Sequence, residues 1–193
     1  MTMKKRSKAE GTQRDMRAAR AAAKDAGQIQ KASAVANWLC GGARVAGTEF
    51  WGEIRDGSEQ DYLVALLRNQ KDQLGRDEIV VALHLTGPWD VRPEGEAPVY
   101  RDQPVDDQLS MLRHLARSIV DRAEIDSATW DLRLIFRDGR ALHIAGQQQP
   151  WTEPWEIQVW WGPEKAQGFG VSNSGYDVSF WTPADFTLGS EPT

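Results

Sequence analysis

The sequence of 193 residues has one cysteine, three histidines and no long apolar run. With Cys40 alone no intramolecular disulfide can form, which excludes the small disulfide-bonded secreted scaffolds and favours a reducing compartment. The longest apolar stretches, such as residues 79–83, are far shorter than the roughly 18 residues of a membrane span. No apolar segment follows the basic N-terminus, as it would in a signal peptide. We therefore expect a soluble, cytoplasmic protein with no membrane partner.

Residues that could carry chemistry are also sparse. His84, His114 and His143 lie on three separate expected elements, and Cys40 stands apart from all of them, so no spacing matches a zinc site. There is no phosphate-binding loop, zincin motif or nucleophile elbow. We expect no catalytic residue, no metal and no cofactor, which favours a protein that is not an enzyme.

Charge is unevenly distributed along the chain. Residues 1–32 hold 9 Lys and Arg against 3 Asp and Glu, a net charge of +6. The remaining residues then hold 23 − 9 = 14 basic and 28 − 3 = 25 acidic side chains, a net charge of −11. The overall charge of −5 therefore averages a basic arm and an acidic body.

The basic arm, residues 1–31, has no large apolar side chains at helical spacing, although its Ala-rich part favours a helix over 13–26. It could neutralise phosphates, or it could be a solvated, partly disordered terminus. No aromatic residue for base stacking precedes Trp38. The candidate contacts to nucleic acid or to another partner are Lys4, Lys5, Arg6, Lys8, Arg14, Arg17, Arg20 and Lys24.

The body, residues 32–185, is expected to be a single α+β domain followed by a tail at 186–193. A helix over 31–40 should close on Gly41 and Gly42. The spacing of apolar residues predicts further helices over 59–74 and 104–120.

Residues 78–85 are apolar on both faces and rich in β-branched side chains, which predicts a buried central strand. The Pro-rich segment 86–104 is expected to be a long surface loop or an internal boundary.

From residue 128 onward the apolar period is two, which predicts a C-terminal antiparallel β-meander of four to five strands packed by one or more helices. A three-residue loop, 137–139, pairs Leu134 with Leu142 and Leu132 with Ile144, and so keeps one face apolar. This register requires Gly139 in the left-handed conformation. Further strands are expected near 155–161, 169–171 and 176–180.

Six of the nine tryptophans lie between residues 130 and 181. They could all be core residues, but strand alternation assigns Trp155 and Trp161 to the apolar face and Trp160 and Trp181 to the opposite one. Because Trp side chains dominate interface energies, we expect a partner surface there, rimmed by acids. The candidate residues are Trp160, Trp181, Glu156 and Asp177.

Residues 109–181 resemble an uncharacterised immunity-like β-domain of actinobacteria. The resemblance rests on the hairpin of residues 132–144, which follows the pattern L-x-L-x-F-x-D-G-x-x-L-x-V with Ile at the last position, on the Glu-Pro-Trp-Glu segment at 153–156, and on a final strand ending in Trp181. The glycine-rich element before the last strand of that family is replaced here by residues 168–175. The resemblance implies binding to another protein rather than catalysis.

The sequence therefore favours a non-enzymatic protein-binding module, immunity-like or antitoxin-like, whose acidic body complements a cationic partner. The alternative is a nucleic-acid-associated or assembly protein, cellular or viral, that docks through its basic arm. Oligomeric state is not predicted by either reading.

Overall fold

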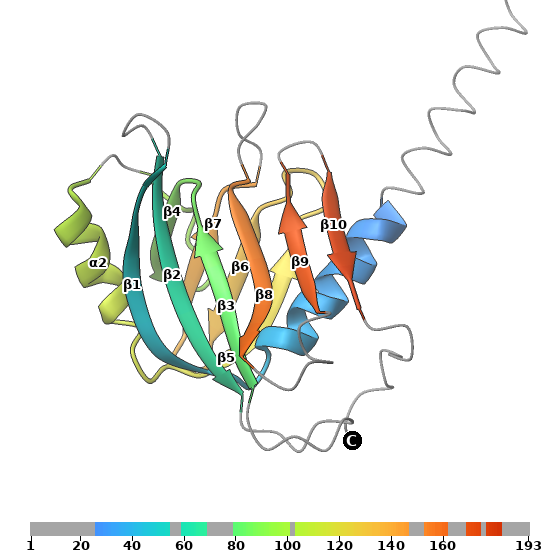
Figure 1. Ribbon diagram of the computed structural model, residues 1–193, viewed down its shortest axis with the longest axis horizontal. Coiled ribbons are helices and arrows are strands. Elements are labelled where there is room, and N and C mark those ends of the chain that lie inside the picture. The colour runs from blue at the N-terminus through green and yellow to red at the C-terminus, as the bar shows by residue number, and fades with distance from the viewer. Residues whose placement is uncertain are drawn as a thin grey trace, which may run out of the picture.

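The computed structural model describes residues 26–54, 59–68, 79–100, 103–146, 153–161, 169–174 and 177–182. These residues form a mostly β, α+β-like fold of two antiparallel sheets and two helices. The six-stranded sheet has the order β1-β2-β3-β8-β9-β10, and the four-stranded sheet has the order β4-β7-β6-β5. Figure 1 shows the larger sheet face-on.

The strands of the six-stranded sheet are β1 (Arg44–Ile54), β2 (Glu59–Arg68), β3 (Ile79–Leu85), β8 (Trp155–Trp161), β9 (Gly170–Asn173) and β10 (Val178–Trp181). Those of the four-stranded sheet are β4 (Trp89–Pro93), β5 (Val120–Ile125), β6 (Leu132–Phe136) and β7 (Arg140–Ile144). The first helix covers residues 26–40, and α2 covers Val105–Arg113. No helix among the described residues is long and apolar enough to cross a membrane.

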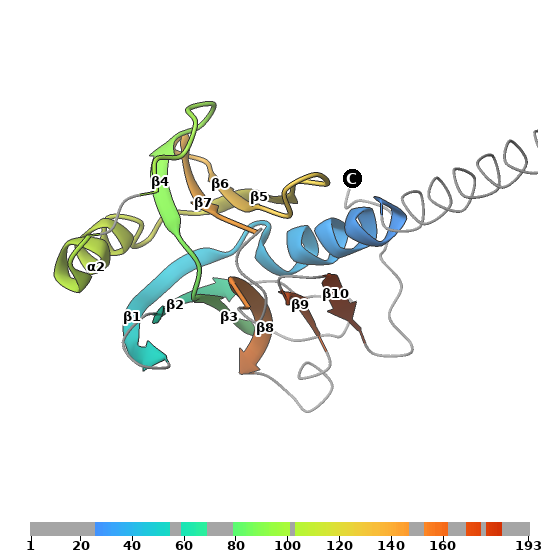
Figure 2. The same ribbon diagram turned by 90° about the horizontal axis from the view of Figure 1, so that it is seen from above.

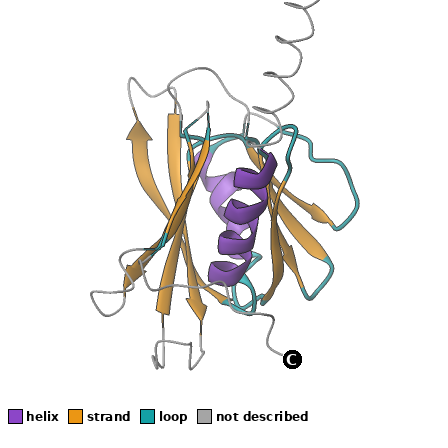
Figure 3. Ribbon diagram, turned by 90° about the vertical axis from the view of Figure 1, so that its right-hand side faces the viewer, coloured by secondary structure: helices purple, strands orange, loops and turns teal. Residues whose placement is uncertain are grey.

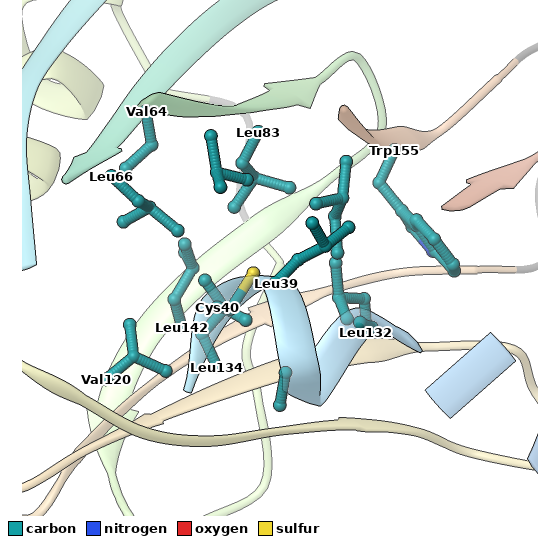
Figure 4. Close-up of a cluster of buried hydrophobic side chains, with 14 of the residues drawn as sticks. Leu39, Cys40, Val64, Leu66, Leu83, Val120, Leu132, Leu134, Leu142 and Trp155 are labelled. Carbon is teal, nitrogen blue, oxygen red and sulfur yellow. The ribbon is translucent and has the colours of Figure 1, made fainter. Parts of the chain in front are cut away.

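The first helix lies between the two sheets (Figures 2 and 3). Its Ile29, Val35 and Leu39 belong to one hydrophobic core to which both sheets contribute. Figure 4 shows Leu39 and Cys40 among Leu66 and Leu83 of the larger sheet and Leu134 of the smaller one. Residues 26–31, which the sequence assigns to the basic arm, are thus part of a packed helix.

The predicted register of the hairpin between β6 and β7 is confirmed. Leu134 pairs with Leu142 and Leu132 with Ile144, and all four side chains are buried. Gly139 has a φ of 83° and donates its N–H to the carbonyl of Phe136, so it occupies the left-handed position that this three-residue loop requires. The alternation of apolar residues and the turn chemistry therefore fixed this register locally.

Two other predictions are also confirmed. The first helix ends at residue 40, and Gly42 adopts a φ of 77°, as expected of a glycine that terminates a helix. β3 pairs with β2 on one side and β8 on the other, so it is a central strand of its sheet.

The predicted helix over 59–74 is wrong, because residues 59–68 form β2. This strand pairs with β1 and β3; Tyr62 and Val64 face the core, and Leu63 on the opposite face is also buried. Because apolar residues occupy both faces, the segment has no alternation of apolar and polar residues, and its leucines fell at helical spacing by chance. Residues 69–74 lie outside the described part of the chain.

The segment 86–104 is not a continuous loop, since it contains β4. This edge strand pairs with β7, and Pro93 is its last residue, a position where a missing N–H is tolerated. The helix predicted for 104–120 is shorter, because α2 ends at Arg113. Beyond it, Val120 exchanges hydrogen bonds with residues 42 and 43 and begins β5.

The C-terminal strands do not form a single meander, which corrects that expectation. β5, β6 and β7 belong to the smaller sheet, whereas β8, β9 and β10 continue the larger sheet from β3. The chain crosses from one sheet to the other between β7 and β8, because both sheets need apolar faces directed at the shared core.

Candidate functional site

The outer face of the six-stranded sheet, which points away from the core, carries the candidate site. Its residues follow from the strand register, since directly paired residues lie on the same face. One row of pairs crosses the sheet through Glu49, Leu63, His84, Glu156, Ser172 and Ser179. The adjacent row contains Gly47, Ala65, Ala82, Gln158, Gly170 and Trp181. Neither row contains a Lys or an Arg.

A β-bulge places Trp51 beside the first row. The register shifts between Phe50 and Gly52, where Gly52 has a φ of 133°. Phe50 packs towards Tyr62, with ring centroids 5.4 Å apart, while Trp51 lies on the outer face and is 49% exposed. Bulges commonly redirect a side chain in this way, and here the result is an exposed indole at the edge of an acidic row.

His84 connects Trp51 to the polar residues of this face. Its ring meets the Trp51 ring edge-on, with centroids 5.2 Å apart. Its Nε2 lies 3.3 Å from Nε2 of Gln158, and its Nδ1 lies 3.6 Å from Oδ1 of Asp61. An amide donor at Nε2 favours the tautomer with the proton on Nδ1, which faces Asp61. His84 is therefore a partly buried side chain with polar neighbours at both ring nitrogens.

Two carboxylates flank His84, and neither has a Lys or Arg partner among the described residues. Oδ1 of Asp61 is buried and accepts no hydrogen bond. Glu156 pairs with His84 across the strands. Burial raises the pKa of Glu156, His84 lowers it, and the carboxylates of Glu153 and Asp61 raise it further. This part of the sheet therefore holds negative charge at an energetic cost.

The outer face of the four-stranded sheet differs because its charges are paired within the protein. Arg92 binds Asp90 at 2.6 Å. Glu124 binds both Arg122 at 2.8 Å and Arg133 at 2.7 Å. A partner would have to break these pairs, whereas the carboxylates of the larger sheet have no Lys or Arg partner among the described residues.

The sequence named four partner-binding candidates, and the structure brings two of them onto this face. Glu156 and Trp181 lie in adjacent rows. The indole of Trp181 covers Gly170, where an added Cβ would lie 2.0 Å from Cζ2 of the ring, so Trp181 also stabilises the sheet.

The other two candidates are placed less directly. Asp177 is exposed just before β10, and Nε2 of Gln28 approaches its carboxylate at 3.4 Å. The pairing of β3 with β8 contains a bulge at Trp160. Val80 pairs with Trp161, and the next residue of β3, Val81, pairs with Val159. Strict alternation therefore does not apply to Trp160 and Trp161, and their side chains lie outside the described part of the structure.

Sequence reasoning did not select Trp51, Asp61 or Glu49. The apolar spacing of residues 59–74 predicts a helix, and a helix there does not place Asp61 beside His84 as the strand β2 does. The weak alternation of apolar and polar residues over 47–57 indicates a strand, and it was the sequence pattern that could have indicated an outward-facing Trp51.

Buried polar groups elsewhere are less accessible. Burial raises the pKa of the Cys40 thiol to about 12, with Arg68 acting in the opposite direction, so the thiol stays protonated at neutral pH. His143 is 6% exposed, and burial, together with Arg133, lowers its pKa. The described residues contain no group of three or more metal-ligating side chains.

The basic candidates from Lys4 to Lys24 lie outside the described residues. Comparisons of the chain with protein-family models, with curated proteins and with solved structures find no match.

Proposed function

We propose that this protein is a non-enzymatic binding module, immunity-like or antitoxin-like, that forms a complex with a basic protein through the outer face of its six-stranded sheet. The observation that supports this most is the contrast between the two sheets. The smaller sheet pairs its surface charges internally, whereas the larger one presents Glu49, Asp61 and Glu156 without Lys or Arg partners among the described residues.

The composition of the face fits a protein partner. Trp51 and Trp181 lie towards opposite edges of the sheet, and aromatic anchors of this kind contribute strongly to interfaces. Between them the adjacent row of pairs carries the small residues Ala65, Ala82 and Gly170. The charge of −11 outside residues 1–32 would steer a cationic partner and accelerate its association.

A charge-reversal experiment tests this proposal. Tagged protein is purified from its native cells, with nuclease present, as wild type, as Glu49→Lys/Glu156→Lys and as the control Glu94→Lys/Glu96→Lys. The control makes the same change of charge in the loop after β4, next to the other sheet. Circular dichroism and thermal melting confirm that each variant folds.

We expect a basic protein to co-purify with the wild type and the control and to be reduced at least tenfold with Glu49→Lys/Glu156→Lys. Equal recovery with both variants, or recovery of no protein partner, would contradict the proposal. Nucleic acid that is recovered without nuclease and lost when residues 1–25 are deleted would favour the basic arm as the binding element instead.

A further inference from the structure

We infer that the partner's basic group at this face is an arginine side chain, which stacks against Trp51 and donates hydrogen bonds to Asp61 and Glu156. This inference rests on the proposed function and specifies its chemistry. It concerns the part of the outer face around His84, between β1 and β8.

Asp61 has a carboxylate oxygen that lacks a hydrogen-bond donor. Oδ1 of Asp61 is buried without a hydrogen bond, and Nδ1 of His84, at 3.6 Å, is too far away to supply one. A buried carboxylate oxygen without a donor is unfavourable. The Asp61 side chain is 16% exposed, so a partner approaches its carboxylate from that side, and a hydrogen bond there gains more than one to a fully solvated carboxylate.

The carboxylates of Asp61 and Glu156 repel each other. Asp61 and Glu156 flank His84 from neighbouring strands, and Asp61 is among the groups that disfavour the charged form of Glu156. A cation that contacts both carboxylates removes this repulsion.

The indole of Trp51 beside these carboxylates favours arginine over lysine. Trp51 is 49% exposed and meets His84 edge-on, so one side of the site is an indole beside carboxylates. A guanidinium is planar, weakly hydrated and able to stack on an aromatic ring while its N–H groups reach two acceptors. An ammonium ion is compact and strongly hydrated, and it fits this combination less well.

The test uses three small probes that differ at one functional group: N-acetyl-arginine amide, N-acetyl-lysine amide and N-acetyl-citrulline amide. Citrulline has nearly the shape of arginine but no charge. Binding to the full chain is followed by NMR through the backbone N–H signals of His84 and Gln158, which every variant retains, at low ionic strength. The variants are Trp51→Ala, Asp61→Asn and Glu156→Gln, with Glu96→Gln as the control that removes one charge from the other side of the molecule.

We expect saturable binding of the arginine probe, at least threefold weaker binding of the lysine probe and no saturation with citrulline. Trp51→Ala, Asp61→Asn and Glu156→Gln should each weaken arginine binding at least threefold, and Glu96→Gln should not. Trp51 is exposed, so Trp51→Ala decides the question if Asp61→Asn does not fold.

Equal binding of citrulline and arginine, or equal affinities for Glu156→Gln and Glu96→Gln, would overturn the inference. This failure is distinct from failure of the proposed function. If Glu49→Lys/Glu156→Lys abolishes the protein complex while arginine binding is independent of Trp51 and Asp61, the face is the interface but the arginine site is wrong.

Discussion

Asn37 of the first helix accepts a hydrogen bond from the backbone N–H of Ala123, with its Oδ1 2.9 Å from the nitrogen. Ala123 lies in the edge strand β5, and the next outward-facing N–H of that strand, at Ile125, donates to Oγ of Ser33 at 3.2 Å. The same helix reaches the edge strand of the other sheet, because Nε2 of Gln28 donates to the carbonyl of Val178 at 2.8 Å. The helix thus fills the space between the sheets and also satisfies backbone groups of two exposed edges.

Removing the Asn37 side chain should destabilise the fold. Asn37→Ala leaves the Ala123 N–H without its acceptor, and we expect a loss of about 1–2 kcal/mol in the free energy of unfolding. Urea denaturation measures it. Gln30→Ala, at an exposed position of the same helix, is the matched control and should change stability by less than about 0.5 kcal/mol. Equal effects of the two substitutions would show that the contact contributes nothing.

Adding a methyl group at Gly170 should disturb the sheet. The new Cβ would lie 2.0 Å from the Trp181 ring, so the indole must move, and we expect Gly170→Ala to cost about 1–3 kcal/mol. A double-mutant cycle with Trp181→Ala tests the cause. The combined substitution should cost less than the sum of the two single ones; simple additivity would mean that the strain arises elsewhere.

Asp138 should give a stabilisation that depends on pH. The side-chain hydrogen bond from Arg140 is the largest cause that lowers the pKa of Asp138 to about 2, and Ser118 contributes. Because the folded pKa lies below the unfolded value of about 3.9, this stabilisation is present above pH 4 and is lost as the pH falls towards 2.

Asp138→Asn should therefore lower stability at pH 7. The carboxylate is 40% exposed, and solvent screening limits the expected loss to about 1 kcal/mol or less. Urea denaturation of wild type and variant between pH 7 and pH 2 should show the difference closing below pH 4. A difference that is constant with pH would contradict this assignment.

The contribution of Glu156 to stability should change with pH in the opposite direction to that of Asp138. Burial raises its pKa in the folded state, so the protein loses stability as the pH rises through that pKa and the buried group becomes charged. Glu156→Gln should be more stable than the wild type at pH 7, by less than about 1 kcal/mol, and equally stable below about pH 4. A glutamine variant that is less stable at pH 7 would show that Glu156 stabilises the isolated fold. It would then not be a residue kept for a partner.

The effect of deleting the basic arm on stability should depend on the last residue deleted. Removal of residues 1–25 should leave the melting temperature unchanged, because the packed helix remains intact. Removal of residues 1–31 also deletes Gln28, which bonds to β10, and Ile29, which is 6% exposed in the core. We expect that longer deletion to cost at least about 2 kcal/mol. Thermal melting of the two truncated chains distinguishes these outcomes.

Local features of the sequence determined several elements by themselves. The hairpin of β6 and β7 was predictable in register because a three-residue loop pairs Leu132 and Leu134 with apolar partners, and Gly139 accepts the positive φ that this loop requires. The end of the first helix at Gly42 and the central position of β3 were also predictable. In each case a backbone requirement or a hydrophobic pattern acts over a few neighbouring residues.

Other features were decided by contacts between distant segments. Residues 59–68 become a strand because β1 and β3 pair with both their edges, and their apolar run from 62 to 67 lacks the alternation that identifies strands from sequence. The division of the C-terminal strands between two sheets, and the helix between them, depends on which apolar faces meet. The candidate site belongs to this second class. The sequence supplied Glu156 and Trp181, but Trp51, Asp61 and His84 come from three strands, and only the tertiary pairing of those strands, which buries a common core, places them together.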